Sequence, residues 1–279
     1  MLHNRLSFYR LIVLISSVFG VMLLGLPLVS LFLRAFIGGM WQGLPDAEIV
    51  DAIILSLQTT SLAAVVIIAI GMPLAYVLVR WRIPFKSLIN LLVQLPIVLP
   101  PSVAGLALLL AYGRRGVLGT PLNDIGINLP FTMWAVIMAQ VFVAAPFFIR
   151  AAQLGFANIP SEIEDAAMVD GASGISLFYF LILPLSWRSL LVGLTLAWTR
   201  AMGEFGATIL FAGRLRGKTE TMPLLVYGAF ERGDIDGAIW AGIILIFITS
   251  AALVFTQLLA RKLSYTDSVS PIQGSLTGL

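Results

Sequence analysis

The chain has 279 residues, of which 59% are hydrophobic and 11% are charged, and its formal net charge is +3. A soluble domain carries about 25% charged and about 45–50% apolar residues, so this composition excludes an ordinary soluble enzyme and a disordered chain. The chain has no cysteine, which excludes disulfide frameworks, thiolate metal sites and cysteine nucleophiles. The small and dispersed positive charge does not indicate nucleic-acid binding.

Apolar segments predict six membrane-spanning helices. A transmembrane helix needs about 20 apolar residues, because the hydrocarbon core is about 30 Å thick. Five segments without Asp, Glu, Lys or Arg are long enough, and a sixth is interrupted only by Arg200 and Glu204. In chain order they are 11–33, 52–79, 87–113, 125–149, 189–213 and 237–260. We therefore expect an all-α polytopic membrane protein with a transmembrane domain at 11–260, an N-terminus at 1–10 and a polar tail at 261–279.

Two segments allow other interpretations. Residues 171–187 are uncharged but number only 17, so we interpret them as an interfacial stretch before the fifth span, with a seventh span as the alternative. The run 11–33 exceeds the about 7–15 apolar residues of a signal peptide and lacks an Ala-x-Ala exit, which favours an uncleaved span. Pro96, Pro100 and Pro101 are expected to bend or interrupt the third span, either for packing or around a pathway.

The distribution of Lys and Arg favours both termini in the cytoplasm. Six spans put both termini on one side, and the loops of that side hold nine Lys and Arg residues against seven on the other. The long inner loop predicts a short helix parallel to the membrane, which Ser161 can cap and Gly171 can end. Its apolar side would carry Ile163, Ala166, Ala167 and Val169. Acidic residues in its first turn favour a protein partner over an anionic lipid surface.

The same loop carries a family resemblance. Asp165-Ala166-Ala167, three residues, Gly171, nine residues and Leu181-Ile182-Leu183-Pro184 resemble the E-A-A-x₃-G-x₉-I-x-L-P signature of permease subunits of bacterial ABC importers. Asp165 replaces the Glu of that pattern and Leu181 replaces the Ile. The resemblance implies a type I ABC importer permease fold and a coupling helix, within the cytoplasmic loop 156–187, that is seated in a separate ATPase subunit. The coupling residues that it implies, within 161–184, are Glu164, Asp165, Ala166, Ala167, Gly171, Leu183 and Pro184.

Further segments resemble the molybdate and sulfate permeases of this family. The run from Arg200 to Thr208 is similar to ARALGEFGAT, and 217–224, 99–103 and 112–116 resemble segments of the molybdate branch. The resemblance favours molybdate (or tungstate) over sulfate or thiosulfate. It implies a homodimer in a bacterial or archaeal inner membrane, two ATP-binding cassette subunits, and an extracytoplasmic anion-binding protein that docks on the outer loops 34–51, 113–130 and 213–236. A secondary transporter or a channel is the alternative, and the sequence shows no clear internal repeat in its favour.

Arg200 and Glu204 are expected on one face of the fifth span, four residues apart, where they can pair. Charged groups inside a membrane are costly and usually face protein or water, so the pair either pins helix packing or lines a pathway or gate. Gly203, Phe205 and Gly206 belong to the same candidate site, since the glycines permit close contact with a second copy. The segment 213–219 lacks the spacing of a phosphate-binding loop. We therefore expect a permease without its own ATPase site, cofactor or metal, with ATP used by the partner subunits.

Overall fold

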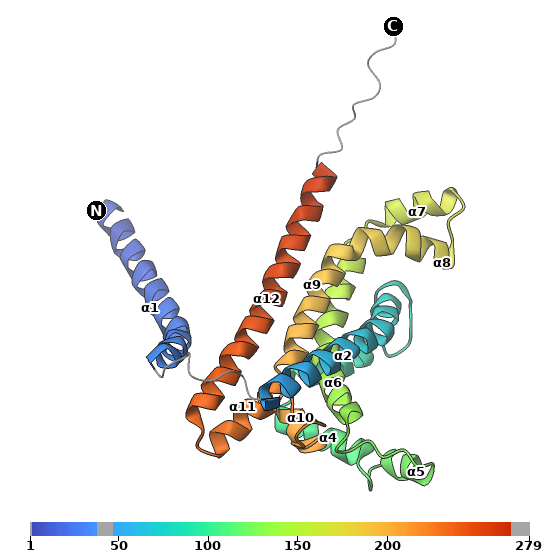
Figure 1. Ribbon diagram of the computed structural model, residues 1–279. Coiled ribbons are helices and arrows are strands. Elements are labelled where there is room, and N and C mark those ends of the chain that lie inside the picture. Colours follow the sequence, from blue (N-terminus) through green and yellow to red (C-terminus); the bar gives the residue numbers. More distant parts are fainter. Residues whose placement is uncertain (1, 38–46, 269–279) are drawn as a thin grey trace.

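The computed structural model describes residues 2–37 and 47–268, with side chains for 9–37 and 47–259, and these parts fold into helices without a strand (Figure 1). The helices are α1 (Leu2–Ile37), α2 (Ala47–Arg80), α3 (Lys86–Val98), α4 (Pro101–Tyr112), α5 (Gly119–Asp124), α6 (Met133–Ala157), α7 (Ser161–Val169), α8 (Gly174–Leu177), the π-helix η1 (Phe178–Ile182), α9 (Leu183–Met202), α10 (Gly206–Phe211), α11 (Met222–Glu231) and α12 (Ile235–Ser268).

Five of the described helices are long and apolar enough to cross a membrane: Tyr9–Ile37, Ala47–Arg80, Met133–Ala157, Gly174–Met202 and Ile235–Leu259. Together α3 and α4 would make a sixth span, but they bend by 120° between Val98 and Pro101. Pro96 lies in the last turn of α3, and Pro100 and Pro101 stand at the break, so the predicted interruption of this span is confirmed. The all-α, polytopic fold predicted from the sequence is confirmed as well.

The centre of the bundle is α6, which packs against α2 on one side and α9 on the other. Its buried face carries Phe148, Ile149 and Ala152, which join side chains of α2 and α9 in the largest apolar cluster of the described residues. Small residues bring the backbones together: a Cβ at Gly193 of α9 would lie 2.6 Å from Cβ of Ala151. Close approach of this kind is how membrane helices gain packing energy without a hydrophobic driving force.

The fourth span is displaced from the predicted range 125–149, because α6 runs from Met133 to Ala157. Phe131 adopts a φ of 62°, and the hydroxyl of Thr132 accepts a hydrogen bond from Ala135 N at 3.3 Å, so the helix begins after this turn. Arg150 does not end the helix, since its guanidinium donates to Gln153 Oε1 at 3.2 Å on the same helix.

The fifth span is also displaced, and residues 171–187 are neither a separate interfacial stretch nor a seventh span. A continuous helix runs from Gly174 to Met202, with the π-turn η1 directly before Pro184. Proline lacks an N–H and its ring clashes with the carbonyl four residues back, and a local π-turn accommodates both effects. The predicted end at 213 is wrong because the helix stops at Gly203.

Figure 1 shows that α7 lies at the same end of the bundle as the beginning of α1 and the end of α12. The short helices α5, α10 and α11 lie at the opposite end. The predicted coupling helix α7 thus lies at one end of the bundle, and the junction of α9 and α10, which holds Glu204, lies toward the other. The division into a transmembrane domain, an inner loop and a polar tail stays a prediction.

Candidate functional site

The first candidate site is the short helix α7 and the turn that follows it. The helix spans Ser161–Val169, but its N-cap is Pro160, and the side chain of Ser161 makes no capping hydrogen bond, contrary to the prediction. Gly171 ends the helix as predicted: its φ is +91°, and Ala172 N donates to Ala167 O at 2.9 Å across the turn. Glycine adopts this left-handed conformation without the steric cost that a Cβ adds.

Most of α7 faces away from the bundle. None of its residues is buried, and only Glu164 and Ala167 are shielded to an intermediate degree. Ala167 packs against the central apolar cluster together with Ala172 of the following turn. The exposed remainder combines carboxylates with apolar side chains: Glu162, Ile163, Asp165, Ala166, Met168 and Val169. Of the predicted apolar side, Ala167 therefore packs inward, whereas Ile163, Ala166 and Val169 remain on the accessible surface.

An ion pair ties α7 to the bundle. The guanidinium of Arg80, the last residue of α2, pairs with the carboxylate of Glu164, and the two side chains are only 19% and 13% exposed. Arg80 Nη2 also donates to Phe156 O, near the end of α6, at 2.6 Å. Glu164, which the resemblance assigned to ATPase coupling, thus has a partner within its own chain. The pairing of Arg80 with Glu164 could not be predicted from the sequence, since the two residues are 84 positions apart and no local pattern links them.

Aromatic packing reinforces this junction. The rings of Tyr76 (α2), Phe156 (α6) and Phe178 (η1) meet edge to face, with centroid separations of 5.9, 5.1 and 6.2 Å. Such pairs each contribute about 0.5–1.5 kcal/mol beyond the burial of their area. Among the predicted coupling residues, Leu183 packs against the same cluster, whereas Pro184 is exposed beside the π-turn. Both lie at the beginning of α9, so they connect the turn after α7 to a long span.

The second candidate site surrounds the end of α9. Arg200 Nη1 lies 2.7 Å from Glu204 Oε2, so the predicted pair forms. Glu204 is not inside the helix, however, because α9 ends at Met202 and a new helix, α10, begins at Gly206. Its other oxygen, Oε1, accepts a hydrogen bond from Ala207 N at 2.8 Å. The carboxylate, only 1% exposed, therefore bonds the first turn of α10 while neutralising Arg200.

This break lies against the break between α3 and α4. A Cβ at Gly206 would be 2.4 Å from Cβ of Pro101, and a Cβ at Gly105 would be 2.9 Å from Ala207. By contrast, a Cβ at Gly203 would meet only Thr199 O at 3.7 Å. Of the two glycines predicted to permit close contact, Gly206 packs within its own chain, against α4. Two interrupted helices are thus locked together near the buried ion pair.

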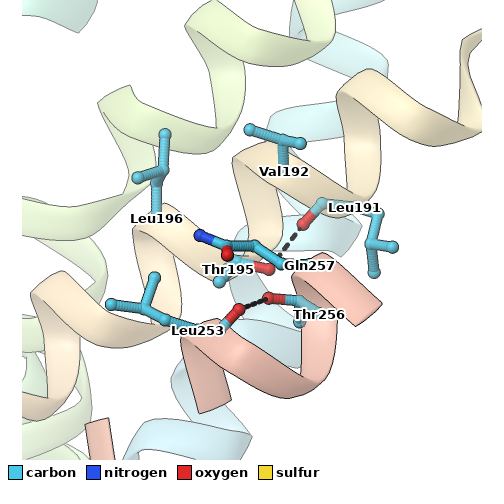
Figure 2. Close-up of a pocket in the computed structure, with 7 residues that line it drawn as sticks. All are labelled: Leu191, Val192, Thr195, Leu196, Leu253, Thr256 and Gln257. Carbon is cyan, nitrogen blue, oxygen red and sulfur yellow. Dashed lines mark hydrogen bonds between the residues drawn. The ribbon is translucent and has the colours of Figure 1, made fainter. Parts of the chain in front are cut away.

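Two further features lie close to α9. Thr59, Thr60 and Gln140 form a buried polar group, in which Gln140 Nε2 donates to the two hydroxyls at 3.2 and 3.3 Å. On another face, a half-open cavity of about 300 Å³ lies between α9 and α12. Figure 2 shows it lined by leucine and valine side chains together with Thr195, Thr256 and Gln257. Both hydroxyls bond carbonyls of their own helix. None of the predicted site residues lines this cavity.

Six charged residues form an ionic network at the end of the bundle opposite α7. Arg214 lies 3.8 Å from Glu220 and 3.7 Å from Glu231, while Glu48 at the beginning of α2 pairs with Arg216 at 3.2 Å and Arg232 at 3.8 Å. Burial, and then the charge of Glu48, raise the pKa of Glu220 above its ordinary value of 4.5, and the nearby arginines oppose this. Arg214 and Arg216, in the outer loop 213–236 that is expected to receive the anion-binding protein, are thus engaged within the chain.

The charged residues of the other predicted outer-loop segments are partly exposed and partly bonded within the chain. Arg114 and Arg115 are exposed beside α5, and Asp234 Oδ1 accepts a hydrogen bond from Gly237 N at 2.9 Å in the first turn of α12. Part of the first outer loop, 38–46, lies outside the described residues. No group of three His, Asp or Glu side chains that could hold a metal ion occurs in the described parts of the chain.

Comparison with known proteins gives consistent matches. Residues 67–265 match the family described as binding-protein-dependent transport system inner membrane component. The probable transport system permease protein NifC of Clostridium pasteurianum is 37% identical over 265 residues, 92% of either chain. The molybdenum transport system permease protein ModB of Mycobacterium tuberculosis is 34% identical over 257 residues, 92% of this chain and 96% of that one. A probable sulfate transport system permease protein, cysT of Zygnema circumcarinatum, is 29% identical over 259 residues, 92% and 90% of the two chains.

Solved structures share the fold. A chain in the crystal structure of a bacterial ABC transporter involved in the import of the acidic polysaccharide alginate matches with a TM-score of 0.73 at 16% identity, over 93% of this chain and 96% of that one. A chain of the alginate transporter in complex with an alginate pentasaccharide-bound periplasmic protein matches with a TM-score of 0.72.

Proposed function

Because the chain belongs to the binding-protein-dependent transport system inner membrane components, the permease subunits of ABC importers, we propose that it forms the pathway of an importer for molybdate or tungstate. Relatives named for molybdenum transport, at 34% identity and over nearly the whole chain, support this substrate. Sulfate is the second candidate, since a sulfate permease is 29% identical over a similar length. An external anion-binding protein would select the oxyanion, and two ATPase subunits would use the ATP.

The observation that carries the coupling part of the proposal is the geometry of α7. The helix presents carboxylates and apolar side chains outward, yet it is fastened to α2 by Glu164 and to the central cluster by Ala167. A helix that is exposed on one face and anchored on the other suits a lever that a neighbouring subunit pushes. The beginning of α1 and the end of α12 lie at the same end of the bundle as α7 (Figure 1), so the proposed contact of α7 with the ATPase would put these helix ends on the cytoplasmic side too.

The proposed path through the membrane involves a second copy of the chain. Arg200 and Glu204 neutralise each other, so they do not offer a free cation to a dianion. We infer that they hold the junction of α9, α10 and α4 in one arrangement, as part of a gate between the two copies. Gly203, whose Cα is open to contact, is the exposed residue of this site for such an interface, while Phe205 is half-buried with its ring against Tyr227.

Cysteine crosslinking tests the proposal directly, because the chain has no cysteine of its own. Met168→Cys, exposed on α7, is expected to crosslink to the ATPase subunit and to resist an impermeant maleimide added outside. The matched variant Arg115→Cys, exposed at the opposite end, is expected to react with that maleimide and not to crosslink to the ATPase. External labelling of Met168→Cys, or no ATPase crosslink from it, would refute the assignment.

Substitutions in the turn test coupling itself. Gly171→Asp places a side chain at a φ of +91° and is expected to destabilise the end of α7 by about 1 kcal/mol. Ala167→Leu adds volume where α7 packs on the central cluster. Both proteins are expected in the membrane, but with ATP hydrolysis uncoupled from uptake of labelled molybdate. Normal uptake together with normal ATPase binding in both variants would contradict the coupling role.

A further inference from the structure

We propose that Arg80 is a positioning residue that makes α7 and α2 move as one body, so that a push on α7 reaches the far end of the bundle. The inference rests on the proposed coupling role of α7. It concerns how a displacement of α7 is transmitted to the other helices, a question that the exposure of α7 does not answer. Three observations carry it: the contacts of Arg80, the scarcity of other attachments of α7, and the course of α2.

The contacts of Arg80 join three helices at one point. Its guanidinium pairs with Glu164 of α7 and donates to Phe156 O of α6, while its backbone closes the last turn of α2. With exposed fractions of 19% and 13%, the paired side chains are mostly removed from water. Loss of one partner from a shielded pair is more costly than loss of a surface pair, which contributes about 0–1 kcal/mol. The planar guanidinium suits this double role, because it can donate to two acceptors at once.

Few other contacts hold α7. None of its side chains is buried, and Ala167 alone among its apolar residues packs against the central cluster. On its C-terminal side the chain passes through Gly171 and Gly174, both with positive φ and with open space around them. These two glycines make the turn that leads to α8, and Ala172 between them packs on the central cluster. The ion pair links α7 sideways to α2, so it is the contact through which α7 can pull or push that helix.

The helix that receives this force runs the length of the bundle. With 34 residues at about 1.5 Å each, α2 is about 50 Å long and is one continuous helix, with Pro73 inside it. At its beginning, Glu48 pairs with Arg216 and Arg232 of the ionic network. The next helices in the chain, α3 and α4, bend by 120° and cannot carry a push in a straight line. Movement of α7 is thus delivered by Arg80 to a helix whose opposite end lies in the ionic network.

The test uses the complete transporter in proteoliposomes, with its ATPase and anion-binding subunits, and measures molybdate uptake per ATP hydrolysed. Arg80→Gln and Glu164→Gln are each expected to keep ATP hydrolysis and to lower uptake per ATP about tenfold. The double variant is expected to be no worse than either single one, because both remove the same interaction. Arg80→Lys keeps the positive charge but loses the planar guanidinium. Its uptake per ATP is expected to lie between the values of the parent and of Arg80→Gln. Arg82→Gln, exposed two residues beyond Arg80 and outside α7, is the control and is expected to behave as the parent.

A second measurement separates positioning from a merely structural role. Spin labels at Trp81→Cys and Glu162→Cys, both exposed, report the distance between the end of α2 and α7. With Arg80 and Glu164 intact, the distribution of this distance is expected to be narrow and to be the same with and without ATP. The distribution is expected to broaden when Glu164→Gln is added. A parent distance that changes with ATP, or unaltered uptake per ATP in Arg80→Gln and Glu164→Gln, would overturn the inference. Failure of the proposed function would look different: Met168→Cys, with Arg80 and Glu164 intact, would not crosslink to the ATPase subunit through α7.

Discussion

Replacement of Glu204 gives the sharpest test of the second candidate site. The carboxylate is 1% exposed and has two different partners: Arg200 Nη1 at 2.7 Å and the backbone N–H of Ala207 at 2.8 Å. Glu204→Ala removes both interactions, whereas Glu204→Gln keeps an oxygen for Ala207 and removes only the charge. The two variants therefore separate the anchoring of α10 from the neutralisation of Arg200.

The contacts give the expected magnitudes. Removal of one partner from a fully buried ion pair costs about 3–5 kcal/mol, but Arg200 is 31% exposed and can recover some hydration. A hydrogen bond to a charged group contributes about 1.5–3 kcal/mol. We therefore expect Glu204→Ala to cost about 3 kcal/mol and Glu204→Gln about half of that. For a chain of this size the first loss corresponds to a fall of about 6–12 °C in the melting temperature.

The assay combines stability with transport. Melting of the purified permease in detergent gives the order parent, Glu204→Gln, Glu204→Ala, while Glu231→Ala serves as the control. Glu231 is 46% exposed and pairs with Arg214 at 3.7 Å, so its loss is expected to cost about 0–1 kcal/mol. In the complete transporter, Glu204→Ala is expected to alter the rate of uptake or assembly without changing the ratio of molybdate to sulfate uptake.

Two results would refute this reasoning. Equal melting temperatures for Glu204→Ala and the parent would mean that the buried carboxylate does not hold α10 against α9. A changed preference between molybdate and sulfate in Glu204→Ala would mean that the pair contacts the anion, contrary to its role as an internally neutralised junction.

Two further predictions concern the interlocked breaks and the ionic network. Gly206→Ala is expected to lower the melting temperature, because its Cβ would lie 2.4 Å from Cβ of Pro101 and overpacking of this kind costs about 1–3 kcal/mol. Gly203→Ala, with open surroundings, is the control and is expected to change the melting temperature little. Equal effects of the two substitutions would contradict the packing argument. Glu220 has a raised pKa, so its protonation stabilises the fold below pH 4.5 and this contribution is lost as the pH rises through the folded-state pKa. Glu220→Gln is therefore expected to lose less stability than the parent between pH 4.5 and 7.5, and melting curves with parallel pH dependence would refute it.

The spans could be predicted from the sequence because lipid imposes a local requirement on each of them. Apolar length identifies a helix without reference to its neighbours, and the prolines around residue 100 indicate their break directly. The ends of the helices were harder to predict. The absence of charge placed the fourth span too early, because α6 begins only after its N-cap, Thr132. It placed the fifth span too late, because that continuous helix already begins at Gly174.

The candidate sites likewise contain features that the local sequence could predict and features that it could not. The EAA-like spacing located α7 and its terminating Gly171, since both depend on residues close in sequence. Arg80 lies 84 positions before Glu164, and only the packing of α2 against α6 brings the two together. The spacing of Arg200 and Glu204 predicted their pairing but not the helix end between them, which depends on how α10 packs on α4.

The first helix has a looser relation to the rest of the molecule. The most apolar stretch of α1 has no buried residue, and α1 meets the other helices mainly through α12, where the rings of Phe32 and Phe247 lie 6.1 Å apart. A single copy of the chain therefore leaves the apolar surface of α1 to be covered by lipid acyl chains or by the second copy of the proposed dimer.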